Sequence, residues 1–156
     1  AARETIAADN AASLWREAYL LAAANDHLAA TRDRWSIKDL ADTAFVLRAA
    51  CEAHDEAQRL FAADGVRPRA VLRSADEERC AAAVLAGLGV SLMPRSLLRP
   101  GMASAEIREV ALERRVMLAW RADIDGELLA ALRDGAASHA WPGRSGALHG
   151  RLDFAR

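Results

Sequence analysis

The stretch from residue 69 to residue 94 constrains the fold most, because it joins two short apolar runs and a helical segment with few connecting residues. Its expected parts are, in order, a strand over Arg69–Arg73, a capping box over Ser74–Glu77, a helix over Asp76–Ala86 and a strand over Gly89–Met93. Gly87 lies where a left-handed helix end requires glycine. Pro94 ends the second strand because it has no amide donor. This order predicts one right-handed βαβ unit.

The other segments continue the alternation of strands and helices. Further strands are predicted over Tyr19–Ala24, Ala44–Leu47, Ile107–Leu112 and Val116–Trp120. Helices are predicted over His54–Ala63, ended by Gly65, over Asp125–Arg133, ended by Gly135, and as a short turn behind a capping box at Ser36–Asp39. Arg95–Ser104 is expected to be a connector, and the residues from Ala136 onward a partly mobile tail. Together these segments predict an α/β fold with a parallel-rich sheet that holds the Gly89–Met93 strand inside.

Two helical stripes of apolar side chains are expected to pack on this sheet. The stripe of the Asp76–Ala86 helix contains Cys80, Val84 and Leu88, with Ala81 and Leu85 beside them. The second stripe contains Leu128, Leu129 and Leu132, and a partner surface is the alternative interpretation for it.

Length and composition limit the class of protein. A chain of 156 residues is long enough for one domain with a sizeable core. It has no apolar run long enough to span a bilayer and no visible secretory signal. The net charge of −1 provides no basic face for nucleic acid, and two cysteines make no disulfide framework. We therefore expect a soluble cytoplasmic domain that makes no membrane contact.

No familiar catalytic or cofactor motif is present. The four histidines, at positions 27, 54, 139 and 149, have no metal-ligand spacing with the cysteines. There is no phosphate-binding glycine loop and no nucleophile elbow. We expect neither an enzyme nor a metal or cofactor.

The order of several short motifs resembles a known family. The motifs are LWREAYLL, SIKDLA, AFVLRAACE, the F-x-x-x-GVRP pattern of Phe61–Pro68 and VLAGLGVSLMP at Val84–Pro94. Each is weak alone, but their order resembles the effector-binding domain of LysR-type transcriptional regulators. Family members usually have His-Pro-Leu-Ala where this chain has His27-Leu28-Ala29, so one proline is missing.

The resemblance implies a type 2 periplasmic-binding-protein-like fold whose first subdomain is incomplete. Residues 1–14 would leave that first subdomain, 15–113 would form the second regulatory subdomain, 114–137 would return to the first, and 138–156 would be the tail. The resemblance also implies a homodimeric or tetrameric parent that binds DNA only through a helix-turn-helix absent from this chain. The implied function is sensing of a small anionic metabolite, such as a carboxylate, in a cleft between subdomains. An oligomerisation or interaction fragment without a functional ligand site is the alternative.

Candidate ligand-binding residues follow the expected strands, because ligands collect at the carboxyl ends of strands in open α/β sheets. Arg48 could hold a carboxylate through two hydrogen bonds, or form a structural pair with Glu52 or Asp55. The amides of Ala49, Ala50 and Cys51 precede a helix and could receive an anion. Ser74 is expected to cap a helix and could also face the ligand.

The two cysteines suggest a further hypothesis. One branch of the family that the chain resembles senses peroxide through a cysteine near the loop of Cys51. That branch needs a resolving cysteine shortly downstream, and Leu60–Ala63 offers none. Cys80 lies on the stripe expected to face the core, where a small packed residue is the simpler interpretation.

Overall fold

The computed structural model describes residues 11–140, so the first ten residues of the expected crossover segment and residues 141–156 of the expected tail lie outside the described part. The chain divides into two compact units. One is Ala18–Arg114, and the described part of the other consists of residues 11–17 and 115–140. Within residues 11–140, no helix has both the length and the apolar character needed to cross a membrane.

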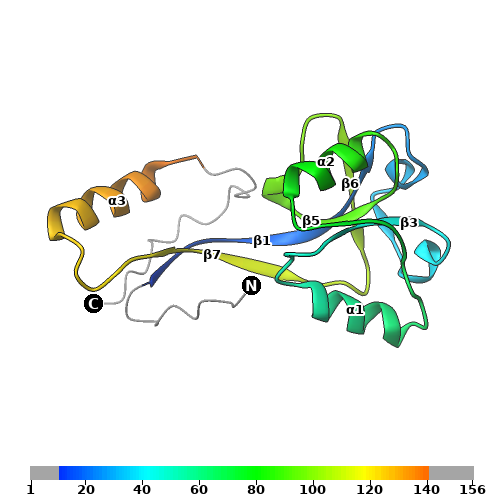
Figure 1. Cartoon of the computed structure of the whole chain (residues 1–156), viewed down its shortest axis with the longest axis horizontal. Helices are drawn as coiled ribbons and strands as arrows, with labels where there is room; N and C mark the ends of the chain where they lie inside the picture. Colours follow the sequence, from blue (N-terminus) through cyan, green and yellow to red (C-terminus); the bar gives the residue numbers. More distant parts are fainter. Residues whose placement is uncertain (1–10, 141–156) are drawn as a thin grey trace. The chain divides into compact units, whose positions relative to one another are not determined.

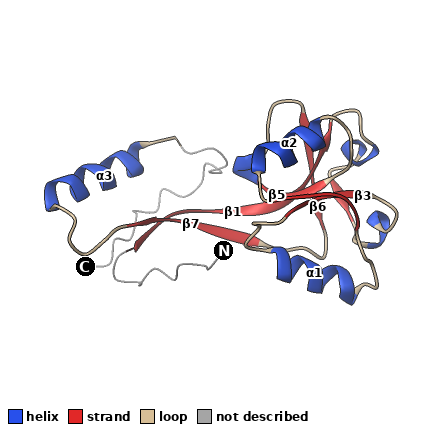
Figure 2. Cartoon of the chain, in the orientation of Figure 1, coloured by secondary structure: helices blue, strands red, loops and turns tan. Residues whose placement is uncertain are grey.

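Strands and helices alternate along the described chain (Figures 1 and 2). The strands are β1 (Ala11–Ala24), β2 (Arg34–Trp35), β3 (Ala44–Arg48), β4 (Arg69–Ser74), β5 (Ser91–Pro94), β6 (Met102–Ile107) and β7 (Glu113–Ala119). The α-helices are α1 (His54–Ala63), α2 (Glu77–Leu85) and α3 (Gly126–Ser138). Three short 3₁₀ turns are η2 (Leu28–Thr31), η3 (Lys38–Leu40) and η4 (Arg95–Leu97).

The strand pairing mixes parallel and antiparallel neighbours. One sheet has the order β2-β6-β1-β5, with β7 also paired to β1, and the other consists of β3 and β4. β3 is parallel to β4 and β2 is parallel to β6, whereas β1 is antiparallel to both β5 and β6. The predicted α/β class is confirmed, but the alternation of helices and strands did not indicate the antiparallel course of β1.

The βαβ unit closes through a single residue, Val90, which forms a parallel bridge with Phe45 of β3. The amide of Val46 donates to the Val90 carbonyl at 2.8 Å, and the amide of Val90 donates to the Ala44 carbonyl at 2.9 Å. The segment before β5 thus lies beside β3, while β5 itself pairs with β1. The predicted interior position of the Gly89–Met93 run is confirmed, because Val90 and Met93 are buried.

The two glycines before β5 are required for different structural reasons. Gly87 has a φ of +73° and open space around it, so it serves only the left-handed helix end. Gly89 needs no unusual φ, but a Cβ there would lie 2.4 Å from the carbonyl oxygen of Ala44. The helix therefore ends on Gly-Leu-Gly because one glycine turns the chain and the other lets the backbone approach β3.

Two hydrophobic clusters lie on opposite faces of β3, in accord with the two-residue period of a strand. Phe45 and Leu47 belong to the cluster under α1, where Phe45 meets Phe61 edge to face at 5.6 Å between ring centroids. Val46 belongs to the other cluster, with Cys80 and Val84 of α2. Helices α1 and α2 accordingly cover the two faces around β3 and β5 (Figure 1).

Several local predictions are confirmed. Helix α1 has the predicted bounds, and Gly65 after it has a φ of +73°. The capping box at Ser36 is present, because the Asp39 amide donates to the Ser36 hydroxyl and the Ser36 amide donates to the Asp39 carboxylate.

Other local predictions are wrong. A strand was expected at Ile107–Leu112, but β6 begins at Met102, inside the expected connector, and ends at Ile107. Glycine does not end α3, which continues through Gly135 to Ser138, so the expected tail begins as helix. The α3 leucines are not buried as expected, since Leu128 is 53% exposed and Leu132 is 44% exposed.

The stripe of α2 is shorter than expected. Cys80, Ala81 and Val84 are buried, but Leu85 is 40% exposed and Leu88 is 51% exposed. Leu88 lies beyond the last helical residue, so the helical spacing no longer places it on the buried face.

Candidate functional site

The carboxyl end of β3 holds Arg48, whose side chain is only 3% exposed. Its Nε donates to Glu77 Oε2 at 2.6 Å, and its Nη2 donates to Glu77 Oε1 at 2.7 Å. Glu77 lies in the first turn of α2, directly after the neighbouring parallel strand β4. Arg48 therefore forms an ion pair within the chain, as the structural alternative expected. Its partner is Glu77, however, and neither Glu52 nor Asp55.

The Arg48 guanidinium is firmly charged in this position. Burial lowers its pKa, but the hydrogen bonds and charge of Glu77 outweigh burial, and the pKa ends above its ordinary value. A bidentate guanidinium–carboxylate pair is the strong form of a charge-assisted hydrogen bond. The donors that would hold a ligand carboxylate are thus already bonded to a carboxylate of the chain.

The loop after β3 contains the other predicted ligand-binding residues, Ala49, Ala50 and Cys51. The Ala49 amide donates to the Ser74 carbonyl at 2.8 Å, and the Cys51 amide donates to the Arg48 carbonyl at 3.2 Å. Two of the three amides expected to receive an anion are therefore bonded within the chain. Ala49 and Ala50 are exposed at the surface of this loop.

Ser74 does not cap α2. Its hydroxyl accepts from the Asp76 amide at 3.1 Å, whereas Asp76 is the N-cap and accepts from the Arg79 amide at 3.1 Å. The predicted capping box fails because Asp76 is closer to the helix and because Glu77 is bonded to Arg48.

A polar network surrounds the loop at Cys51 and Glu52. Cys51 Sγ lies 3.6 Å from Arg48 Nη1 and 4.0 Å from the Tyr19 hydroxyl. Glu52 is hydrogen-bonded by the Tyr19 hydroxyl and by Arg114 Nη1, the latter at 3.2 Å. The loop is thereby joined to β1 through Tyr19 and to β7 through Arg114.

The network changes the pKa values of Glu52 and Tyr19. Burial raises the pKa of Glu52, but hydrogen bonds from its own amide, from Tyr19 and from Arg114 outweigh burial, and the pKa ends below its ordinary value. Burial, followed by the hydrogen bond to Glu52, raises the pKa of the Tyr19 hydroxyl. The carboxylate is therefore held ionised and the phenol neutral.

The two cysteines are free and lie in different surroundings. Cys51 is half-buried in the network, whereas Cys80 is fully buried and its Sγ lies 3.6 Å from the Ser74 carbonyl oxygen. Burial raises the pKa of the Cys80 thiol, which suits a packed structural residue. Among residues 11–140, no three histidine, cysteine, aspartate or glutamate side chains are grouped so as to hold a metal ion.

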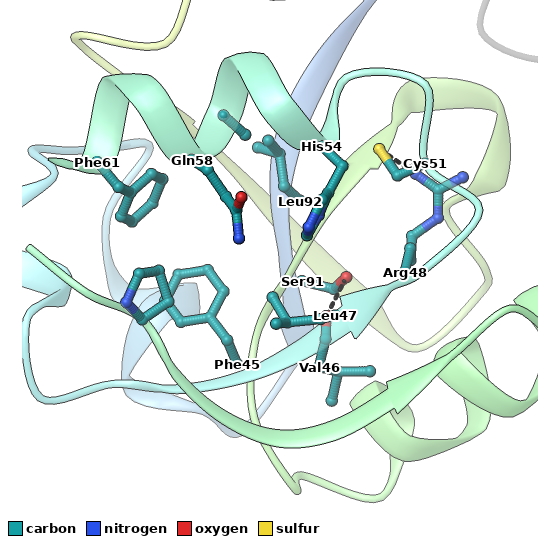
Figure 3. Close-up of a pocket in the computed structure, with 12 residues that line it drawn as sticks. Phe45, Val46, Leu47, Arg48, Cys51, His54, Gln58, Phe61, Ser91 and Leu92 are labelled. Carbon is teal, nitrogen blue, oxygen red and sulfur yellow. Dashed lines mark hydrogen bonds between the residues drawn. The ribbon is translucent and has the colours of Figure 1, made fainter.

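A pocket lies between α1 and the strands β3 and β5, with a cavity volume of about 100 Å³ (Figure 3). Most of its lining is apolar. The lining residues are Phe45, Val46, Leu47, Arg48, Cys51, His54, Ala57, Gln58, Phe61, Pro68, Ser91 and Leu92.

Sequence reasoning placed two of these lining residues, Arg48 and Cys51, at a ligand site, and it missed the pocket itself. A usable signal was the spacing of His54, Ala57 and Gln58, which puts two polar side chains and a small one on one helical face. Ser74, by contrast, does not line this pocket.

Comparison with known proteins shows which family this chain belongs to. Residues 7–140 match the family model described as the LysR substrate binding domain. No curated protein matches the chain at a significant level.

Solved structures share the fold. The regulatory domain of CcmR from Synechocystis PCC6803, in complex with 2-PG, has a TM-score of 0.68 and 23% identity over 88% of this chain and 69% of its own. The C-terminal domain of a probable LysR family transcriptional regulator from Rhodococcus sp. RHA1 has a TM-score of 0.65 and 25% identity, over 80% and 65%. The effector binding domain of QuiR, in complex with shikimate, has a TM-score of 0.63 and 19% identity, over 84% and 66%. The chain thus spans 65–69% of the length of these three chains.

Proposed function

The chain belongs to the family of LysR substrate-binding domains, and on this premise we propose that it senses a small anionic metabolite for a bacterial transcriptional regulator. Domains of this family have a type 2 periplasmic-binding-protein-like fold and belong to transcriptional regulators rather than to enzymes. The finer parts of the proposal concern the effector, its position and the rest of the regulator.

The buried Arg48 carries the proposal that the effector is anionic. Its charge lies at the carboxyl end of β3, where ligands collect in such sheets. Glu77 holds it now, but the Glu77 side chain is 37% exposed, so it can turn toward water when a ligand carboxylate takes its place. In this mechanism the carboxylate of Glu77 occupies the position of the ligand carboxylate when no ligand is bound. The other residues of the site, which lie around this position, are Ala49, Ala50, Cys51 and Ser74.

The organisation of the parent protein is also a proposal. Residues 15–113 act as the second regulatory subdomain, and residues 1–14 and 114–137 connect it with a first subdomain, the effector lying in the cleft between them. A helix-turn-helix outside this chain binds DNA, and the regulator works in the cytoplasm as a homodimer or tetramer.

A thermal-shift series with small carboxylates tests the proposed function on the full chain. A ligand at a hundred times its Kd stabilises the folded protein by about 2.7 kcal/mol. We expect at least one carboxylate to raise the melting temperature of the wild type and to lose that effect in Arg48→Ala. Glu77→Gln should bind the same carboxylate more tightly, because the competing charge is gone.

The control is Arg59→Ala, which removes an exposed arginine of α1 and should leave the ligand response unchanged. A carboxylate response that persists in Arg48→Ala would refute the role of Arg48. No response to any carboxylate would favour the alternative, an oligomerisation or interaction fragment without a functional ligand site.

A further inference from the structure

The pocket beneath α1 differs in chemistry from the Arg48–Glu77 pair. Side chains of β3 alternate between the two faces of the strand: Phe45 and Leu47 belong to the cluster under α1, whereas Val46 belongs to the cluster under α2. Arg48 continues this alternation and bonds Glu77 of α2. The positive charge of Arg48 is thus balanced by the carboxylate of Glu77.

Two polar side chains project into the pocket from α1, those of His54 and Gln58 (Figure 3). They lie four residues apart and therefore on one helical face. Within residues 11–140 the structure gives neither side chain a hydrogen-bond partner. The other polar lining groups are engaged, as the Ser91 hydroxyl donates to the Val46 carbonyl at 2.8 Å.

The remaining lining is apolar. Phe45 and Phe61 meet edge to face, and Leu47, Pro68 and Leu92 complete the apolar lining. Ala57, between the two polar residues of α1, also lines the pocket with a small side chain. Pockets that are mainly apolar, with a few hydrogen-bonding groups, are typical of small-molecule sites.

We infer a second small-molecule site, beneath α1, that binds an uncharged aromatic molecule carrying one hydrogen-bonding group. The ring lies among Phe45, Leu47 and Phe61, and the polar group bonds His54 and Gln58. As long as Glu77 holds Arg48, a carboxylate among these residues would be desolvated without a counter-charge and is therefore disfavoured. Arg48 and Cys51 line this pocket as well as the anion site of the proposed function, but the apolar residues around the ring and the two polar residues of α1 are not part of that site.

Benzamide and benzoate test the inference, because they have the same shape and differ in charge. Their binding to the full chain is measured by titration in ¹H–¹⁵N correlation spectra. We expect benzamide to bind with a Kd on the order of 1 mM, as small fragments do, and benzoate to affect the pocket residues at least about fivefold more weakly. Benzamide should shift the amide signals of Leu47, Ala57 and Gln58, and leave that of Ser74 unchanged.

Ala57→Leu fills the pocket and should weaken benzamide binding about tenfold or more. Its matched control is Ala62→Leu, the same substitution at an exposed position of α1, which should change the Kd by less than about twofold. Gln58→Ala changes an exposed side chain without loss of core packing, so it keeps the test valid if Ala57→Leu does not fold, and should weaken binding about threefold or more.

Absence of saturable benzamide shifts in the wild type would overturn the inference, as would equal binding of benzoate at the same amides. Unchanged benzamide affinity in Gln58→Ala or in a folded Ala57→Leu would also overturn it. Benzoate shifts confined to the loop after β3 and lost in Arg48→Ala would support the proposed anion site alone. The two proposals can therefore fail independently.

Discussion

The Arg48–Glu77 pair predicts an asymmetric effect of its two single substitutions on stability. Glu77→Ala leaves a guanidinium that is 3% exposed without a partner, whereas Arg48→Met leaves a carboxylate that is 37% exposed and can be hydrated. Removal of one partner of a fully buried pair costs about 3–5 kcal/mol. Hydrogen bonds to charged groups contribute about 1.5–3 kcal/mol. We expect Glu77→Ala to cost about 3 kcal/mol and Arg48→Met about 1–2 kcal/mol of the free energy of unfolding.

Urea unfolding of the wild type, both single variants and the double variant measures the asymmetry and the coupling. The double variant leaves no unpaired charge, so it should cost less than the sum of the two singles, with a coupling of about 1.5–3 kcal/mol. A larger loss for Arg48→Met than for Glu77→Ala would refute the argument from exposure. A coupling below about 0.5 kcal/mol, the limit for independent sites, would show that the pair contributes little in solution.

Three further predictions concern local features. Gly89→Ala should lower the free energy of unfolding by about 2–4 kcal/mol in urea unfolding, because the new Cβ would lie 2.4 Å from the backbone of Ala44. Gly87→Ala should cost about 1–2 kcal/mol for its positive φ alone, and equal losses in the two variants would contradict this reasoning. Asp76→Ala should cost about 1 kcal/mol as the N-cap of α2 and Ser74→Ala less, and the reverse order in thermal melts would restore Ser74 as the cap. The pKa of Glu52 is depressed in the folded state, so its contribution is complete above the unfolded pKa of about 4.3 and is lost as pH falls through the folded pKa. Acid titration of Glu52→Gln should therefore show a smaller loss of stability in that range than the wild type does.

Local signals in the sequence predicted α1 and the Ser36–Asp39 capping box well. The bounds of α1 followed from the helical spacing of its apolar residues and from Gly65, and the Ser36–Asp39 capping box needs only contacts within four residues. These features depend on backbone chemistry near the residue itself, so one stretch of sequence contains the required information.

The parts that failed depend on neighbours distant in the chain. Nothing near Arg48 indicates Glu77, 29 residues further on, because the contact requires β3 and β4 to be adjacent and parallel. The pocket beneath α1 likewise requires residues from α1, β3 and β5 together. β6 was missed because its short alternating pattern resembles a connector until β1 and β2 are placed on either side of it.

The bonds of Glu52 to Tyr19 and Arg114 have a thermodynamic consequence. The chain passes between its two compact units at residues 17–18 and again at residues 114–115. Tyr19 and Arg114 stand next to these two passages, and both are bonded to one carboxylate in the loop after β3. A change in the bonds of that carboxylate therefore also changes the free energy of the conformation that the chain adopts beside Tyr19 and Arg114. By reciprocity, a strain imposed on the chain beside Tyr19 and Arg114 changes the stability of the bonds that Glu52 makes in the loop after β3.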